Sequence, residues 1–254
     1  MKKLLLAALV SSSILTANAQ HVDVGLHGGY GTTWLINNNV SDQGPELDAQ
    51  VSFGSVFGVH AGYYTASRVG VVMEINRAVV NQKYKGESGA FNYEINDKLT
   101  FIEVPLLLRK YSKGGFYFEI GPKFSFLNNA REDFTNSPAN PLDPDYKDLN
   151  VKAGYSKTII SAAFGIGGQF EIAKNIYADV RLRFAYGFSD ATKKFSEIEL
   201  LTMSEDISYG SGYAHFKQNG DYAYKKTNMA TGHVMAGITY KIPMVKKPVS
   251  VKKK

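Results

Sequence analysis

The stretch ATGHVMAGITYKI, residues 230–242, changes character at every step. One set of its residues is apolar or small, namely Ala230, Gly232, Val234, Ala236, Ile238, Tyr240 and Ile242, and the residues between them are Thr231, His233, Met235, Gly237, Thr239 and Lys241. Because successive side chains of a strand point to opposite faces of a sheet, one face suits lipid and the other suits a polar interior. The pattern recurs about eight times, which is typical of a transmembrane β-barrel.

An export signal precedes the first of these segments. Lys2 and Lys3 form a positive start, residues 4–15 are mostly apolar, and Ala17-Asn18-Ala19 is a small-x-small cleavage site. The apolar run is too short to span a bilayer as a helix, which needs about 20 residues. We therefore expect a signal peptide over residues 1–19, an outer membrane β-barrel over residues 20–242, and a Lys-rich periplasmic tail over residues 243–254.

Composition excludes several classes of site. The chain has no Cys, so disulfides, thiolate metal sites and a Cys nucleophile are absent. Its net charge is +6, but two lysines fall in the signal and five in the tail, which leaves the barrel near −1. The body carries no basic stripe interleaved with aromatic residues, so we expect no nucleic-acid partner.

The connections between the predicted strands alternate in length. Eight segments alternate in polarity, approximately residues 22–32, 51–64, 69–83, 98–110, 115–127, 158–172, 175–188 and 229–242. The connections 33–50, 84–97, 128–157 and 189–228 are medium or long, whereas 65–68, 111–114 and 173–174 are short. Outer membrane barrels have short periplasmic turns and long extracellular loops. The sequence thus predicts an all-β, eight-stranded antiparallel transmembrane barrel of the outer membrane with both termini in the periplasm.

Period-two alternation also predicts which charges face the lumen. In segment 175–188, Arg181 and Arg183 share the face opposite to Leu182 and Phe184, and turning the strand over would place both arginines in lipid at about 2–4 kcal/mol each. Arg77 is the exception, because it falls on the outward face. The predicted inward charges are Asp23, Glu74, Glu103, Arg109, Glu119, Lys123, Glu171, Asp179, Arg181, Arg183 and Lys241.

These inward charges are nearly balanced in sign, which favours a structural network of ion pairs. An eight-stranded barrel is just wide enough for its own side chains to fill it, so we expect a plugged barrel. The alternative is a selective pore or a proton path through glutamate and histidine. His27, His60 and His233 lie nearby, but their spacing has no metal or catalytic signature. We therefore expect no catalytic, cofactor-binding or metal-binding residues, and no cofactor.

Two other hypotheses are weaker. Asp143, Asp145 and Asp148 in a Pro-rich loop could suggest calcium, but the full EF-hand spacing is missing. A lipocalin is also an eight-stranded barrel, with its apolar face turned inward. Its usual Gly-x-Trp signature is absent, because Gly31 and Trp34 are three positions apart.

The stretch Leu99-Thr100-Phe101-Ile102-Glu103-Val104-Pro105-Leu106-Leu107-Leu108-Arg109 resembles the fourth-strand signature of PorT-like outer membrane β-barrel proteins of Bacteroidota. So do Glu119-Ile120-Gly121-Pro122 and the Ala19-Gln20 junction. The resemblance implies a barrel of the porin family without assigned catalytic residues, whose founding member is implicated in type IX secretion. The chain departs from a familiar bacterial pattern, in which a terminal aromatic residue closes the last strand.

Three functions follow as hypotheses. The first is a non-enzymatic barrel that is structural or accessory to secretion or surface assembly, with outer membrane lipid around it and protein partners at loops 128–157 and 189–228. The second is a small solute pore. The third is a membrane-embedded lipid-modifying enzyme that uses one of the inward histidines as a base.

Overall fold

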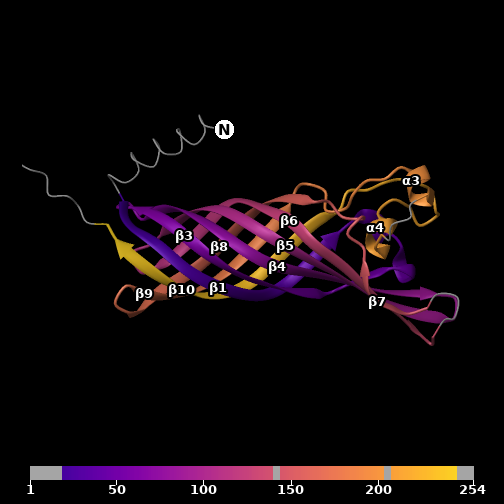
Figure 1. Ribbon diagram of the computed structural model, residues 1–254, viewed down its shortest axis with the longest axis horizontal. Coiled ribbons are helices and arrows are strands. Elements are labelled where there is room, and N and C mark those ends of the chain that lie inside the picture. Colours follow the sequence, from indigo (N-terminus) through magenta and orange to yellow (C-terminus); the bar gives the residue numbers. More distant parts are fainter. Residues whose placement is uncertain (1–18, 140–143, 203–206, 245–254) are drawn as a thin grey trace, which may run out of the picture.

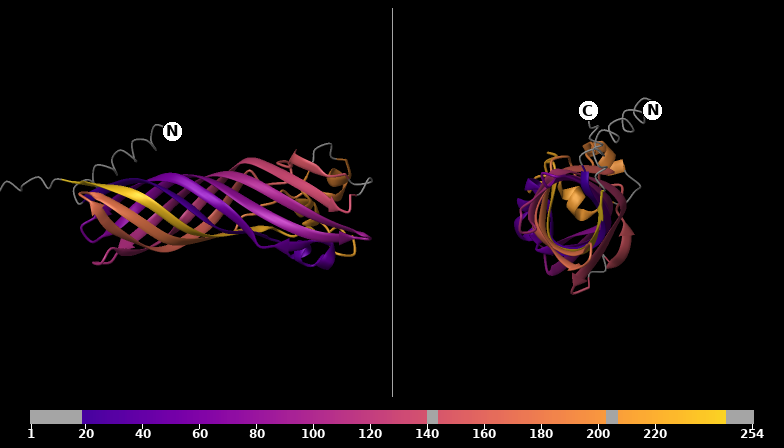
Figure 2. Two further views of the ribbon diagram at one scale, coloured as in Figure 1. Left: turned by 90° about the horizontal axis from the view of Figure 1, so that it is seen from below. Right: turned by 90° about the vertical axis from the view of Figure 1, so that its left-hand side faces the viewer.

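The computed structural model describes residues 19–139, 144–202 and 207–244. Nearly all of the expected signal peptide and most of the Lys-rich tail lie outside these residues. Eight long strands form a closed antiparallel ring in the order β1-β3-β4-β5-β6-β8-β9-β10, with β10 paired to β1 (Figure 2). The predicted eight-stranded antiparallel barrel is confirmed. The strands are β1 (Ala19–Ile36), β3 (Ser52–Thr65), β4 (Val69–Ser88), β5 (Phe91–Tyr111), β6 (Phe116–Ser137), β8 (Thr158–Ala173), β9 (Ile176–Gly187) and β10 (Asn228–Pro243).

The strands are strongly tilted, as the pairing register shows. We start at Phe57 on β3 and step from each residue to its direct partner on the next strand. Through β4 and β5 this path reaches Phe126 on β6. In the other direction, through β1, β10, β9 and β8, it reaches Phe116, which is ten positions from Phe126 on the same strand. In a closed barrel such a stagger requires strands tilted by typically 35–45° from the axis. With eight strands the interior is just wide enough for side chains to fill it.

The two ends of the barrel differ in construction (Figure 1). The turn end carries the first and last strand ends and the connections 66–68, 112–115 and 174–175. The loop end carries all the remaining structure, which we call the cap. Its elements are α2 (Asn38–Ser41), the 3-10 turn η2 (Gly44–Glu46), β2 (Asp48–Gln50), β7 (Tyr146–Asn150), α3 (Glu197–Thr202) and α4 (Tyr209–Tyr213).

The predicted loop 84–97 is wrong, and the predicted loop 128–157 is wrong in part, because β6 continues to Ser137 and β7 lies within it. The segment 84–97 is a continuation of β4 and β5, whose ladder runs to the pair Ser88 and Phe91 and turns at Gly89 with a φ of 62°. Its inward residues Tyr84 and Ile95 are buried, and the outward ones are charged or polar. The alternation therefore continues beyond the apolar part of the barrel, with a polar outward face that resembles a loop in sequence.

Apolar residues face outward and polar residues face inward along the middle of each strand. Phe57, Ile75, Phe164 and Val180 are each about half exposed or more, whereas Glu74 and Arg181 have at most 1% of their surface exposed. A lipocalin has the opposite orientation, so that hypothesis is wrong. No helix in the described ranges has the length and hydropathy needed to cross a bilayer.

The outward apolar band has a clear limit at the loop end. On β5 the last outward apolar residue is Ile102, and on β6 it is Phe126. Beyond them the outward positions are polar, for example Lys98 and Arg131. This part of β4, β5 and β6 therefore projects past the lipid-facing surface and carries the cap.

Candidate functional site: a closed lumen beneath a docked cap

Arg183 lies at the centre of the lumen. Its Nη1 is 2.6 Å from Oε2 of Glu74 and its Nη2 is 2.8 Å from Oε1 of the same carboxylate. Its Nε is 2.8 Å from Oε1 of Glu119. Arg183 is on β9 and Glu74 on β4, which are opposite strands of the ring. The charge-assisted contact therefore crosses the whole width of the barrel.

Three more charges join this centre. Arg109 donates from Nε and Nη2 to Oε2 of Glu119, at 3.0 and 2.7 Å. Arg181 places Nη2 3.3 Å from Oε1 of Glu74 and donates from Nη1 to Asp179 at 3.1 Å. The side chains of all six residues are at least 93% buried. Three guanidiniums therefore face three carboxylates, and the charge is balanced as a buried network requires.

A layer of tyrosines closes the network toward the turn end. The Arg109 guanidinium lies 4.4 Å from the ring centroid of Tyr117, and its Nη1 is 3.4 Å from the hydroxyls of Tyr64 and Tyr111. The hydroxyl of Tyr117 donates to Asp179 at 2.7 Å. These rings pack with Val72, Leu107, Ala163 and Ala185 in one buried cluster.

Toward the loop end the lumen is also filled. Lys123 donates to Glu103 at 2.6 Å, and Ser125 donates to the same oxygen at 3.0 Å. This pair is separate from the central network. Above it an apolar layer from six ring strands and the cap crosses the barrel. Its buried members are Leu35, Val80, Leu99, Phe101, Leu127, Ala130, Val151, Tyr155, Ile159, Ala191 and Met229.

The remaining predicted charges lie at the turn end. Asp23 is fully buried, with Nε2 of His21 at 3.3 Å from its Oδ1. Lys241 places its ammonium 3.8 Å from the ring centroid of Tyr177. Glu171 lies apart from the central network, because it is exposed beside the β8–β9 turn and accepts from the backbone of Asn175.

Two of the inward histidines, His27 and His60, form side-chain hydrogen bonds, whereas Nε2 of His233 is buried without a hydrogen-bond partner among the described residues. Nδ1 of His27 is 3.3 Å from Nδ1 of His60, and Nε2 of His27 is 2.9 Å from Oδ1 of Asn76. Nε2 of His60 is 3.2 Å from the hydroxyl of Thr239. Among the described residues no group of three or more His, Cys, Asp or Glu side chains could hold a metal ion. The contacts of His27 and His60 are those of buried polar groups that satisfy one another.

The cap is docked onto the barrel mouth by side-chain-to-backbone hydrogen bonds. Asn37 and Asn39, next to and on α2, donate to the carbonyls of Lys225, Ala214 and Ala223. The long connection 188–227 is therefore held against the β1–β3 connection. Between these layers Tyr84, Tyr93, Ile95 and Phe134 pack with Val40 and Leu47 in a second buried core.

Two carboxyl groups are buried in this cap, beyond the outward apolar band. Asp97 and Glu132 are direct partners across the β5–β6 ladder, and both are fully buried. Asp97 accepts from the hydroxyl of Tyr155 at 2.7 Å, and Glu132 accepts from the backbone of Tyr209 on α4 at 2.9 Å. Oδ1 of Asp97 has no hydrogen-bond partner among the described residues, so this carboxyl group is buried with only part of its hydrogen-bonding capacity satisfied. Burial, with the charge of Glu132 second, holds the pKa of Asp97 well above its usual value.

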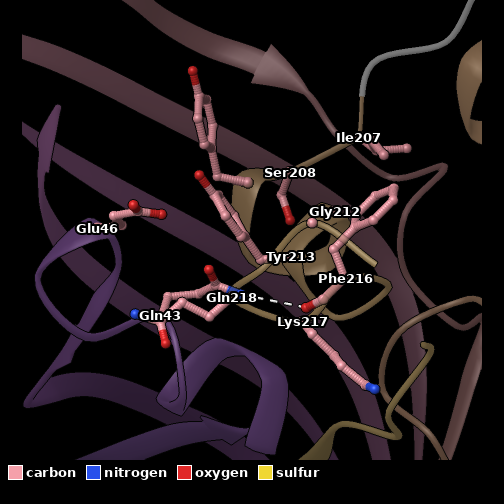
Figure 3. A pocket seen from close by; sticks show the side chains of 11 residues that line it. Gln43, Glu46, Ile207, Ser208, Gly212, Tyr213, Phe216, Lys217 and Gln218 are labelled. Atoms are coloured by element: carbon pink, nitrogen blue, oxygen red, sulfur yellow. Dashed lines mark hydrogen bonds between the residues drawn. The ribbon is translucent and has the colours of Figure 1, made fainter. Parts of the chain in front are cut away.

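A recess of about 470 Å³ opens in the cap (Figure 3). Gln43 and Glu46 line one side, and Tyr213 and Phe216 line the other. The amide of Gln43 donates to the carbonyl of Phe216 at 3.3 Å across its floor. A recess of this size and aromatic lining is within the range of small-ligand sites.

Sequence reasoning did not assign Tyr64, Tyr111 and Tyr117 to the lumen, and it did not predict the pair Asp97 and Glu132. The tyrosines fall on the inward positions of their strands, so the same pleat that placed Arg109 inward also places Tyr111 inward. The sequence predicts a loop at Asp97, whereas this residue lies in β5. Nothing in its neighbourhood signals that Glu132, 35 positions later, lies opposite.

An apolar outer face, a polar interior and a closed ring of tilted strands are the properties of a barrel in lipid. Residues 18–193 match the family profile described as outer membrane protein beta-barrel domain. The chain belongs to that family. Its place is therefore the bacterial outer membrane.

Solved structures with similar chains include Neisserial surface protein A, at 12% identity and a TM-score of 0.37 over 87% of this chain and 97% of that one. AlkL has 10% identity and a TM-score of 0.40, over 93% and 94%. The outer membrane protease OmpT from Escherichia coli has 9% identity and a TM-score of 0.35, over 89% and 98%. These similarities say nothing of the activity of this chain. No curated protein matches it.

Proposed function

We propose that this protein is a closed, non-enzymatic barrel of the outer membrane that presents its cap to a protein partner, as a structural or accessory component of secretion or surface assembly. The observation that carries this proposal is the contact between Arg183 and Glu74, which joins opposite walls of the lumen. In this proposal the loop end is extracellular and the turn end, with both termini, is periplasmic. The PorT-like resemblance supports the same assignment.

A solute pore is less well supported by this geometry. A conducting path needs a continuous polar route, whereas the tyrosine layer and the apolar layer each cross the lumen. The charges between them are paired with one another. We expect the protein to be silent in planar bilayers, and a stable single-channel current from the unmodified chain would contradict the closed-barrel part of the proposal.

The enzyme alternative also lacks a specific observation. His27 hydrogen-bonds Asn76, and His60 contacts the hydroxyl of Thr239. Both histidines are buried in the lumen, where a membrane lipid has no access. We expect the lipid composition of the outer membrane to be unchanged by His27→Ala, and an altered composition would favour the enzyme.

A hydrophobic side chain on the cap points to the contact surface. Ile198 on α3 is 74% exposed, and it lies far from the outward apolar band. Contiguous exposed apolar patches mark protein contacts, and Ile198 would contribute its side chain to such a patch. We expect α3 to be in the surface that meets the partner.

The test is the native mass of the tagged full-length protein extracted gently from outer membranes. We expect a mass far above one chain with its detergent, and its loss in Ile198→Glu but not in the matched substitution Glu197→Gln on the same helix. A particle of monomer size from the unmodified protein would contradict the accessory role. A large particle that survives Ile198→Glu would move the contact away from α3.

A further inference from the structure

Arg77 is out of place on the outward face of β4. It follows Val71, Met73 and Ile75 on that face and precedes Val79. Its direct partners on the neighbouring strands are Phe57 and Ile102, both exposed and apolar. Within the described residues Arg77 has no hydrogen bond or ion pair, whereas Lys110, the outward lysine of β5 beside Val69 and Phe118, donates to the carbonyl of Ser67.

The position of Arg77 along the strand limits its cost. An arginine at the bilayer midplane costs about 2–4 kcal/mol, falling to about 0–1 kcal/mol near the interface. Arg77 is one outward position below Val79, after which Asn81 and Lys83 begin the polar face. Its aliphatic stem can lie along apolar surface while the guanidinium extends to the headgroup level.

A second unpaired cation lies on the same face. Lys98 is four residues along β5 from Ile102, the direct partner of Arg77, which is about 13 Å at ~3.3 Å per residue. In the described part of the chain Lys98 also has no ion pair, and its direct partners are Asn81 and Arg131. The nearest outward acid on β5, Glu94, is paired with Lys85 at 2.9 Å. This surface, which we call the Arg77 face, therefore carries two positive charges, Arg77 and Lys98, that form no ion pair among the described residues.

We propose that Arg77 and Lys98 bind the anionic phosphorylated headgroup of a lipid in the leaflet that surrounds the loop end. A guanidinium can hold a phosphate through two parallel hydrogen bonds, and a lysine can approach it as a point charge. The acyl chains of the lipid would lie on Phe57, Ile75 and Ile102 below. This inference rests on the membrane location of the barrel and is independent of the proposed protein partner.

The test is retention of added lipid by the refolded full chain, measured by native mass spectrometry. The probes are diphosphoryl lipid A and the zwitterionic phosphatidylcholine. We expect retention of lipid A, a drop of at least about fivefold in Arg77→Leu and in Lys98→Gln, and partial recovery in Arg77→Lys, because one of the two parallel hydrogen bonds is lost.

The matched control is Lys110→Gln, which neutralises an exposed outward lysine at the turn end. We expect it to retain lipid A like the unmodified protein. Heat-dependent electrophoretic mobility shows that each variant is folded. Equal lipid A retention by the folded Arg77→Leu variant, or equal retention of phosphatidylcholine by the unmodified protein, would overturn the proposal.

Discussion

Asp97 and Glu132 face each other across neighbouring strands, and both carboxyl groups are fully buried. Tyr155 and the first residue of α4, Tyr209, hold the two ends of this pair. The pair therefore connects the barrel wall to the part of the cap that covers the mouth.

The carboxyl pair predicts that docking of the cap weakens as pH rises. Burial raises the pKa of both groups above the usual value of about 4. At pH values between the usual pKa and the raised pKa, the docked cap binds more protons than the undocked cap. The free energy of docking is therefore most favourable at low pH and becomes less favourable as pH increases. We expect the connection 188–227 to be cleaved faster by proteinase K at higher pH, after normalisation to denatured protein.

Asp97→Asn tests this origin, because it removes one of the two charges and keeps the shape of the side chain. We expect the pH dependence of cleavage to flatten. The control is Asp148→Asn, which changes an exposed carboxyl in β7. An unchanged profile in Asp97→Asn would show that another group controls docking.

Replacing Arg183 should destabilise the barrel. Arg183→Leu leaves the carboxylates of Glu74 and Glu119 buried with fewer cations, and breaking a buried ion pair on one side costs about 3–5 kcal/mol. We expect a lower midpoint of heat-dependent mobility change, with partial recovery when Glu74→Gln is added. Arg131→Leu, an arginine about a third exposed on its side chain, is the control. Equal midpoints for Arg183→Leu and the unmodified protein would mean that the network contributes little.

Tyr155→Phe should loosen the cap. The hydroxyl donates to Asp97 at 2.7 Å and lies 2.8 Å from the hydroxyl of Ser208. Removing it leaves a buried carboxyl oxygen without that donor, at about 1–3 kcal/mol. We expect faster proteolysis within 188–227 and an intact barrel by mobility, whereas Tyr30→Phe, on an outward ring that is 62% exposed, should change neither.

Gly121→Ala should impair closure of the barrel. A Cβ at this position would overlap the backbone carbonyl oxygen of Leu106 on the neighbouring strand, and a backbone atom cannot move without disturbing the ladder. Gly28→Ala is the matched control, because the nearest atom to its Cβ would be 3.7 Å away. We expect a lower refolding yield for Gly121→Ala alone, and similar yields would show that the β5–β6 ladder absorbs the extra carbon.

Much of the wall of the barrel could be predicted from the sequence. Arg181 and Arg183 are inward because their neighbours Leu182 and Phe184 are apolar, and a strand has only two faces. The same argument identified Arg77 as an outward charge. The alternation argument did not identify the strand residues 84–97. Outside the lipid the outward face of a strand is polar, so such a strand resembles a loop in composition.

The alternation of polar and apolar residues by itself determined the eight strands, which side chains face outward, and the class of barrel. This is because an alternation with a period of two residues depends only on neighbouring positions in the chain. The tertiary structure alone decided that Arg183 meets Glu74, 109 positions away, that Glu171 lies apart, and that Asp97 and Glu132 are buried side by side. These contacts depend on the stagger and curvature of the closed ring. That closure brings opposite walls within reach of one side chain and fills the lumen.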